Sequence, residues 1–454
     1  MQIHFNPKEF LCKFRLAASA ATSRDAVSIL QNVKIVACKK HGTVLMATDT
    51  KLGIRVTVDC TVSKNGAALL PIKRLLKMLP LLKDASITLE NSKTGIVLYS
   101  DSKRVELESG DPNKFQDVVE FSETVSCMMP VGILQYAIRC TTFAVDPNHG
   151  QIPIGVCFES DGTSIEVVAT DGCRLAWQRV KTKTRRFKPS IILLATISIS
   201  ECVLKDTSAQ SDDQVKMAFK DDSVVIQCGH IMLRSQLFVS KNNSSFPHWQ
   251  SVISDERNIS QGIVQYGELL RAVHRAMIMT CKDNPVRLEV DNERLVVVGQ
   301  CPEAGAVEIT VPIDFTGQAT FHMLPIQMID FLSSFDKTME FSLYLSTEEK
   351  KPAMLCIQDG YTYIMSPSKV VEMEQPDADT GAEIVGESQT KEEPMKKPVE
   401  KSSDSDSNRE METKLLSLMS ENDQLQAKVE HYKALLERSM RGIEKIKRDQ
   451  RCIA

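Results

Sequence analysis

The chain has 454 residues, of which 42% are hydrophobic, and a formal net charge of −4. This length predicts about three domains, and the hydrophobic fraction is sufficient for buried cores. The charge excludes a protein that is basic over its whole surface, so any affinity for nucleic acid must come from a local arrangement of charge. Residues 1–369 are nearly neutral, with 40 acidic and 41 basic residues, whereas residues 370–454 hold 19 acidic and 14 basic ones.

The 13 cysteines are scattered along the chain without a Cys-x-x-Cys pair. This pattern disfavours a zinc or thioredoxin-like site and indicates buried thiols in a reducing cytosol. The N-terminal segment lacks the apolar core of a signal peptide. The longest largely apolar run, 191–199, is too short to span a membrane. We therefore expect a soluble intracellular protein.

Three segments of the chain share one order of features, in which an apolar stretch leads through a proline into an amphipathic run. The prolines are Pro71, Pro189 and Pro325, which lie 118 and 136 residues apart. The strand-like segment 42–58 is echoed by 162–180. Repeats of this length are whole domains rather than solenoid units. We predict three α+β domains, at residues 1–124, 125–253 and 254–369.

Each repeat is expected to open with a helix. In the first repeat, Phe10, Phe14 and Ala17 recur on one helical face, and Asn6-Pro7 provides a start signal. Alternating and continuous apolar runs then predict strands. The runs that follow the three prolines predict a second helix in each repeat.

The composition changes near Val370. Residues 370–410 hold 12 acidic residues and no aromatic ones, which predicts an acidic disordered linker. From Met411 a heptad pattern predicts a coiled-coil helix over residues 411–450, most simply a parallel dimer, with a single amphipathic helix docked on the body as the alternative. The a positions of the heptads are Leu415, Asn422, Val429, Leu436 and Ile443.

No common catalytic motif occurs in the sequence: it lacks a phosphate-binding loop, a zinc-protease helix motif and a nucleophile elbow. Asp49 and Asp171 recur after a threonine in the first two repeats, which would allow an enzyme with paired carboxylates. Equivalent positions of separate domains should lie far apart, however. We therefore expect each Asp to cap a tight turn, with Gly172 at positive φ, and we predict no catalytic residue, metal or cofactor.

Basic residues recur on the expected helices, on faces turned away from the apolar residues. The second repeat contributes fewer of them than the first and the third. If these helices line a channel, its wall is positive in a nearly neutral body. The residues in question are Lys8, Arg15, Lys73, Lys77, Arg139, Arg271 and Arg275.

Three segments carry a resemblance to a known family: VVATDGCRLAW (167–177), SFPHWQSVI (245–253) and YTYIMSPSK (361–369). In sequence and spacing the chain resembles the bacterial sliding clamps, the processivity subunits of the replicative DNA polymerase, over residues 1–369. The resemblance implies three clamp domains per chain and a six-domain ring made by two chains joined head to tail. By the match, the joining edges carry Val105 and Leu107 on one side and Ile278 and Met279 on the other.

The resemblance also implies a function without catalysis. The ring would encircle double-stranded DNA and tether the polymerase by topology, with phosphate contacts but no base-edge contacts. Arg24, and His149 in the loop 148–152, match loops that contact DNA in the family. The polymerase, the clamp loader and other partners would insert a Gln-Leu-x-Leu-Phe-like peptide between domains two and three. Carried over by position, that pocket comprises Thr170, Gly172, Cys173, Arg174, Leu175, Pro247, Val252, Ile364, Ser366, Pro367 and Ser368.

Alternatives remain open for the tail and for the whole chain. Residues 415–419 resemble the partner motif and would occupy the pocket of the same chain, whereas a pair of tails would associate as a coiled coil. The repeated body would otherwise be a scaffold that binds proteins without encircling DNA. On the clamp interpretation the protein is cytoplasmic and associates with the nucleoid.

Overall fold

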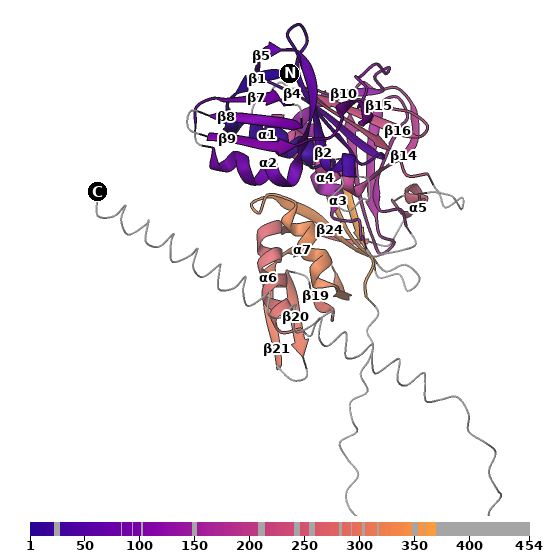
Figure 1. Cartoon of the computed structure of the whole chain (residues 1–454). Helices are drawn as coiled ribbons and strands as arrows, with labels where there is room; N and C mark the ends of the chain where they lie inside the picture. The colour runs from indigo at the N-terminus through magenta and orange to yellow at the C-terminus, as the bar shows by residue number, and fades with distance from the viewer. Residues whose placement is uncertain are drawn as a thin grey trace, which may run out of the picture. The chain divides into compact units, whose positions relative to one another are not determined.

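The computed structural model describes residues 1–368, apart from residues 22–27, 83, 93, 101–102, 148–151, 208–213, 240–245, 254–258, 281–283, 292, 302–304, 316, 347–352 and 359 (Figure 1). The expected linker at 370–410 and the expected coiled coil at 411–450 lie outside the described residues. Within the described part of the chain, no helix is long and apolar enough to cross a membrane.

The first repeat begins with a strand that leads into a capped helix. Asn6 caps this helix, because its side-chain oxygen accepts hydrogen bonds from the N–H groups of Lys8 (3.0 Å) and Glu9 (3.5 Å), and Pro7 occupies the first helical position. The elements are β1 (Gln2–Phe5), α1 (Pro7–Ala18), η1 (Ser28–Gln31), β2 (Asn32–Cys38), β3 (Gly42–Thr48), β4 (Leu52–Val58), β5 (Thr61–Lys64), β6 (Gly66–Pro71), α2 (Ile72–Met78), η2 (Leu79–Leu81), β7 (Ile87–Asn91), β8 (Gly95–Ser100), β9 (Lys103–Glu108) and η3 (Pro112–Lys114).

The second repeat follows the same order and adds a short helix at its end. Its elements are β10 (Cys127–Pro130), α3 (Val131–Thr142), β11 (Gly155–Ser160), β12 (Ser164–Thr170), β13 (Arg174–Lys181), β14 (Phe187–Leu193), α4 (Leu194–Thr207), β15 (Gln214–Phe219), β16 (Ser223–Cys228), β17 (Ile231–Gln236) and α5 (Trp249–Ile253).

The third repeat has the same plan as the second up to its last strand. Its elements are β18 (Ile259–Gln265), α6 (Tyr266–Ile278), β19 (Val286–Asp291), β20 (Arg294–Cys301), β21 (Gly305–Pro312), β22 (Asp314–Phe315), β23 (Gln318–Met323), α7 (Pro325–Ser333), β24 (Glu340–Ser346), β25 (Ala353–Gln358) and β26 (Tyr361–Met365).

The prediction of a proline-led helix is right for two repeats and wrong for one. Helix α2 begins directly after Pro71 and α7 begins at Pro325, but Pro189 lies inside strand β14 and α4 begins only at Leu194. Residues 190–193 continue the pairing of β14 with β11 instead. A proline is compatible with this position because β14 is the outermost strand of its sheet.

Two of the four sheets run from one repeat into the next. An eight-stranded sheet has the order β10-β15-β16-β17-β4-β3-β2-β6, and a nine-stranded sheet has the order β14-β11-β12-β13-β26-β25-β24-β18-β22. The pair β17–β4 therefore joins the second repeat to the first, and β13–β26 joins the second to the third. The remaining sheets, β5-β1-β7-β8-β9 and β21-β20-β19-β23, belong to the first and third repeats alone.

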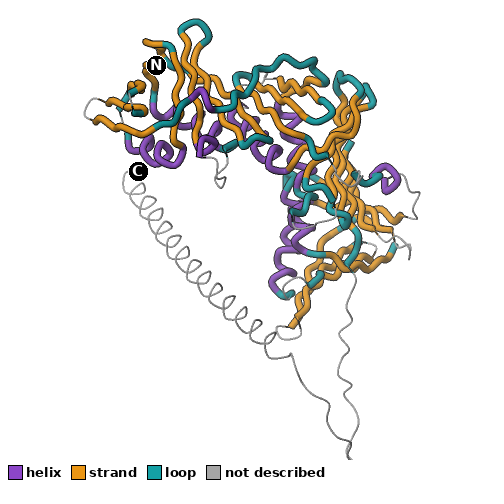
Figure 2. Tube along the Cα trace, turned by 45° about the vertical axis from the view of Figure 1, so that its right-hand side comes forward, coloured by secondary structure: helices purple, strands orange, loops and turns teal. Residues whose placement is uncertain are grey.

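Helices and sheets form separate layers in the described body. Figure 2 shows α1, α2, α3, α4, α6 and α7 along one side of the sheets, and α5 along the other. The helices bury apolar faces against the strands: on α6 Tyr266, Leu269 and Val273 are at most 1% exposed. The opposite faces of these helices are left for solvent or a ligand.

Candidate nucleic-acid and partner-peptide sites

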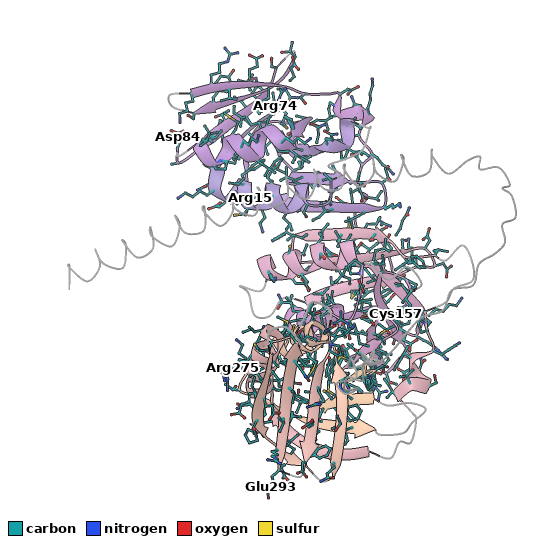
Figure 3. The ribbon with its side chains drawn as sticks, turned by 90° about the horizontal axis from the view of Figure 1, so that it is seen from below. Arg15, Arg74, Asp84, Cys157, Arg275 and Glu293 are labelled. Carbon is teal, nitrogen blue, oxygen red and sulfur yellow. The ribbon has the colours of Figure 1, made fainter. Side chains whose placement is uncertain are left out.

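The predicted phosphate-facing side chains that the structure describes are all exposed on the helix layer. They come from four helices, and none is needed for the core. Figure 3 labels Arg15 on α1 and Arg275 on α6. The exposed residues are Lys8 and Arg15 on α1, Lys73 and Lys77 on α2, Arg139 on α3, and Arg271 and Arg275 on α6. Arg24 and His149 lie outside the described residues.

Sequence reasoning missed two members of this surface, Arg74 on α2 and Lys205 on α4. Arg74 is exposed on α2 between the two predicted lysines and is labelled in Figure 3. The signal used for prediction was the i, i+4 pair of Lys73 and Lys77, which skips the residue next to it. Burial of Leu75 and partial burial of Leu76 turn all three basic side chains outward.

The turn between β12 and β13 is built by a threonine and an aspartate. Asp171 Oδ1 accepts hydrogen bonds from the N–H groups of Cys173 and Arg174, both at 2.9 Å. Thr170 Oγ1 accepts from the Gly172 N–H (3.1 Å) and donates to the Arg174 carbonyl (2.6 Å). Gly172 has φ +92°. The prediction of a capped turn with glycine at positive φ is confirmed.

The turn between β3 and β4 repeats this construction in the first repeat. Asp49 Oδ1 accepts from the N–H groups of Lys51 (2.9 Å) and Leu52 (2.6 Å), and Thr48 makes the two bonds that Thr170 makes in the second repeat. Thr50, in the place of Gly172, has φ +79°. Both carboxylates are thus used by their own turns, which removes the basis for a paired-carboxylate enzyme.

Arg174 ties the second of these turns to the third repeat. Its Nε donates to Asp171 Oδ2 at 2.8 Å, and its Nη1 donates to Asp330 Oδ2 on α7 at 3.0 Å. The side chains of Arg174 and Asp171 are only 8% and 4% exposed, whereas that of Asp330 is 39% exposed. Burial raises the pKa of the neighbouring Tyr363 phenol, which therefore stays neutral beside this charge cluster.

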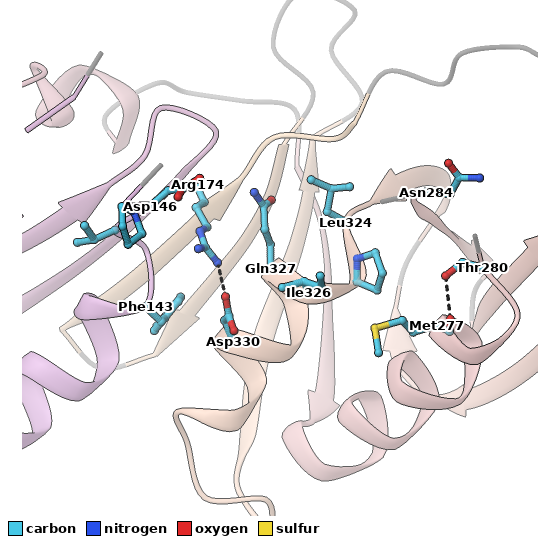
Figure 4. A pocket seen from close by; sticks show the side chains of 13 residues that line it. Phe143, Asp146, Arg174, Met277, Thr280, Asn284, Leu324, Ile326, Gln327 and Asp330 are labelled. Atoms are coloured by element: carbon cyan, nitrogen blue, oxygen red, sulfur yellow. Dashed lines mark hydrogen bonds and ion pairs between the residues drawn. The ribbon is translucent and has the colours of Figure 1, made fainter. Parts of the chain in front are cut away.

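A pocket of about 720 Å³ opens beside this cluster, between the end of α3 and the helices α6 and α7 (Figure 4). Its walls are largely apolar, with the Arg174–Asp330 ion pair in one wall. Apolar walls with a few polar groups are typical of sites that bind small molecules or peptide side chains. The apolar lining includes Phe143, Val145, Met277, Leu324, Pro325 and Ile326.

The predicted partner pocket is assembled by the β13–β26 pair. Leu175 lies opposite Ile364 in the register, and the Ser366 N–H donates to the Cys173 carbonyl at 2.9 Å. The turn residues 170–175 and the end of the third repeat are therefore neighbours. Gly172, Cys173 and Ser366 are exposed, Pro367 and Ser368 are half-buried, and Thr170 is buried.

Helix α5 covers part of the predicted pocket. Ile253 packs against Ile364, and Trp249 lies against Trp177 with ring centroids 5.6 Å apart. Leu175 and Ile364 are only 5% and 4% exposed, so they form a buried floor beneath the turn. The accessible apolar residues of the predicted set are Pro247, which is exposed, and Val252, which is 37% exposed.

The predicted joining residues lie on two separate parts of the body. On β9, Val105 is half-buried and Leu107 is 8% exposed. At the end of α6, Ile278 is 76% exposed and Met279 is half-buried at the C-cap. Leu81, at the end of η2, is 62% exposed and was not predicted; its apolar neighbours in the sequence concealed it.

The comparisons with known proteins agree on one family. Residues 1–118 match the model for the N-terminal domain of the DNA polymerase III beta subunit. A beta sliding clamp of Synechococcus elongatus is 25% identical over 331 residues, covering 70% of this chain and 85% of that protein. A beta sliding clamp of Synechocystis is 23% identical over 327 residues, covering 67% of this chain and 82% of that protein.

Solved structures share the fold. The DNA polymerase sliding clamp of Bacillus subtilis matches with a TM-score of 0.74 at 19% identity, covering 82% of this chain and 99% of that one. A sliding clamp of Pseudomonas aeruginosa bound to griselimycin matches with a TM-score of 0.73 at 19% identity, covering 82% of this chain and all of that one. The sequence relatives, the family model over the first repeat and the solved structures agree, so this chain is similar to the beta sliding clamps of DNA polymerase III in sequence and in fold.

Proposed function

We propose that two copies of this chain close into a ring that encircles duplex DNA and tethers the replicative polymerase to it, without catalysis. The three repeats act as clamp domains at 1–124, 125–253 and 254–369. The proposal is supported by which two strands remain without a partner at the outer ends of the body.

Each repeat contributes one strand of each kind to a junction. By their order in the two sheets of a repeat, β4, β13 and β21 are equivalent, and so are β9, β17 and β26. Inside the chain, β17 pairs with β4 and β26 pairs with β13. Only β9 and β21 are left over, one at each outer end. A second chain supplies the missing partner at both ends, which makes a closed head-to-tail ring.

The side chains near these edges fit such a joint. Val105 and Leu107 on β9, with Leu81 nearby, meet Ile278 and Met279 of the partner. Ile278 is 76% exposed in the single chain, which is unusual for a large aliphatic side chain unless it is covered by a partner. The ring then turns the helix layer, with its exposed basic residues, toward the DNA.

The partner site follows the same reasoning. The polymerase, the loader and other partners each insert a short apolar peptide beside the turn 170–175, over Val252 and Pro247, at the junction of the second and third domains. The 720 Å³ pocket next to Arg174 extends the accessible surface there. The protein acts on the chromosome in the cytoplasm.

The joint is tested by Ile278→Glu. We expect this variant to sediment as a monomer at concentrations where the unaltered chain is a dimer, because a carboxylate cannot be buried in an apolar joint without a partner. Ile133→Glu is the control, since Ile133 is 40% exposed on α3 of the second repeat, which carries neither β9 nor β21. A dimer that survives Ile278→Glu contradicts the proposed joint.

Topological binding is tested with a nicked circular duplex and a clamp loader. We expect the loaded protein to stay on the circle through gel filtration and to be released when the circle is cut once. Protein that stays bound to the linear product would show ordinary binding rather than encirclement.

A further inference from the structure

The exposed charge of the helix layer is distributed unequally among the repeats. The first repeat presents five exposed cations on α1 and α2: Lys8, Arg15, Lys73, Arg74 and Lys77. Glu9 is the exposed acid on these two helices. The second repeat presents Arg139 and Lys205, and the third presents Arg271 and Arg275.

The cations of the first repeat are also unneutralised. In the described part of the chain, none of the five forms an ion pair. Arg139, Arg271 and Arg275 form no ion pair among the described residues either, so the repeats differ in the number of their exposed cations; Arg139 lies over the Tyr136 ring, with 5.7 Å from its Cζ to the ring centroid. Helix α7 of the third repeat exposes Ile326 (58%), and its Asp330 is bound to Arg174. Positive potential is therefore concentrated on α1 and α2.

We infer that the first repeat is the phosphate-bearing sector of the ring, so that DNA rests mainly against α1 and α2 of the two chains. This inference rests on the proposed ring and names the surface within it that DNA uses. In a head-to-tail dimer the two sectors face each other across the channel, related by the twofold axis. The second and third repeats, with two exposed cations each, then act as a more weakly charged wall along which the duplex passes.

The physical reason is the short range of electrostatic attraction in salt. At physiological ionic strength an exposed charge acts over a screening length of about 8 Å, so scattered single cations add little to a distant phosphate. Five cations on two neighbouring helices act on one stretch of the backbone together. Each phosphate contact contributes about 0.9 to the slope of log affinity against log salt, which makes the contacts countable.

The test compares two triple variants that remove the same charge. The first variant carries Arg15→Gln, Lys73→Gln and Arg74→Gln, which remove three positive charges from the first repeat. The second variant carries Arg139→Gln, Arg271→Gln and Arg275→Gln, which remove three positive charges from the second and third repeats. All six side chains are exposed, so both variants should keep the fold, which thermal melting and sedimentation of the dimer verify.

Affinity of each full-length dimer for a short fluorescent duplex is measured by anisotropy over a series of salt concentrations. We expect the first-repeat variant to lose about two units or more of salt slope, and the second variant less than about one. Equal losses, or a larger loss in the second variant, overturn the inference while leaving the ring intact. If the unaltered protein is not retained on a nicked circle, the proposed ring is wrong. That result comes from a different measurement than the salt slopes, so the two failures can be told apart.

Discussion

The two junctions inside this chain have the same strand pairing and the same turn, but they are covered in opposite ways. At the first junction, between β4 and β17, a segment that includes Phe115 and Val118 is buried over the sheet, with Val118 against Gly53. At the second, between β13 and β26, α5 covers the sheet only in part and leaves Val252 37% exposed. The sheet is thus covered by an extended segment at the first junction and by a short helix at the second.

Charge separates the two junctions as clearly as burial does. The covering segment of the first is fastened by ion pairs to the sheet, Lys34–Asp117, Arg55–Glu120 and Arg234–Glu123. The second has the buried pair Asp171–Arg174 in its turn, and Arg174 also binds Asp330 of α7 in the pocket wall. The first junction is therefore fastened over its sheet by its own chain, and the second is the one at which we propose the peptide site.

Removing the buried cation of the second junction should have the largest effect. Arg174→Ala leaves the Asp171 carboxylate, 4% exposed, without its ion-pair partner. We expect a loss of about 3 kcal/mol in the free energy of unfolding, as for other buried pairs broken on one side. At the first junction, Arg55→Ala breaks a pair whose Glu120 is 75% exposed, so we expect a loss below about 1 kcal/mol. Urea denaturation of both variants measures the difference, and equal losses would remove the contrast between the junctions.

Exchanging the turn residues should have a medium effect, with opposite signs at the two junctions. Gly172→Thr places a β-branched side chain at φ +92°, with its Cβ 3.1 Å from Ile152 Cδ1, and should cost about 1–2 kcal/mol. Thr50→Gly relieves a threonine held at φ +79° and should stabilise by about 0.5–1 kcal/mol. Thermal melting gives both shifts. Destabilisation by Thr50→Gly would show that the threonine is held without strain.

An effect about as large as that of Thr50→Gly should come from Glu123, which fastens the cover of the first junction. Desolvation raises the pKa of this carboxyl group, but hydrogen bonds from Arg234, the Ser122 N–H and Lys220 outweigh it and lower the pKa to about 2. Because the folded pKa lies below the ordinary value of 4.5, its contribution to stability is complete above pH 4.5 and is lost as the pH falls toward 2.

Glu123→Gln should therefore cost about 1 kcal/mol at neutral pH and nothing at the lower end of this window. The measurement is the free energy of unfolding of both proteins at pH 6 and at pH 2.5. A variant that remains as pH-dependent as the unaltered chain over this range would show that other carboxylates carry the effect. Glu120→Gln, at an exposed position of the same segment, is the control.

The local features of the fold could be predicted from the sequence because they depend on neighbouring residues. The cap at Asn6, the helix start at Pro325 and the Asp171 turn each require a few residues at fixed spacing. Pro189 shows the limit: the same residue that begins a helix in one repeat lies at the edge of a sheet in another. The difference comes from β11, which pairs with the residues around it.

The site was less predictable because it depends on contacts between distant segments. Position in the sequence gave the neighbours of the turn, but not that α5 covers Leu175 and Ile364, since this depends on how Trp249 packs on Trp177. The hydrogen bond between Arg174 and Asp330 joins residues 156 positions apart, and no local sequence pattern predicts it. The pairing of β17 with β4 likewise follows from the folded arrangement of whole repeats.

Because two sheets are shared between repeats, the repeats should unfold together. The main-chain hydrogen bonds of β4 and β13 are made with strands of another repeat. Unfolding of one repeat therefore leaves an edge strand of its neighbour without its hydrogen-bonding partner. The amides of these strands should exchange with solvent only in the most global opening events, and fragments cut between repeats should aggregate through their bared edges. The repeats thus share one plan, but each depends on another repeat for the main-chain pairing of an edge strand.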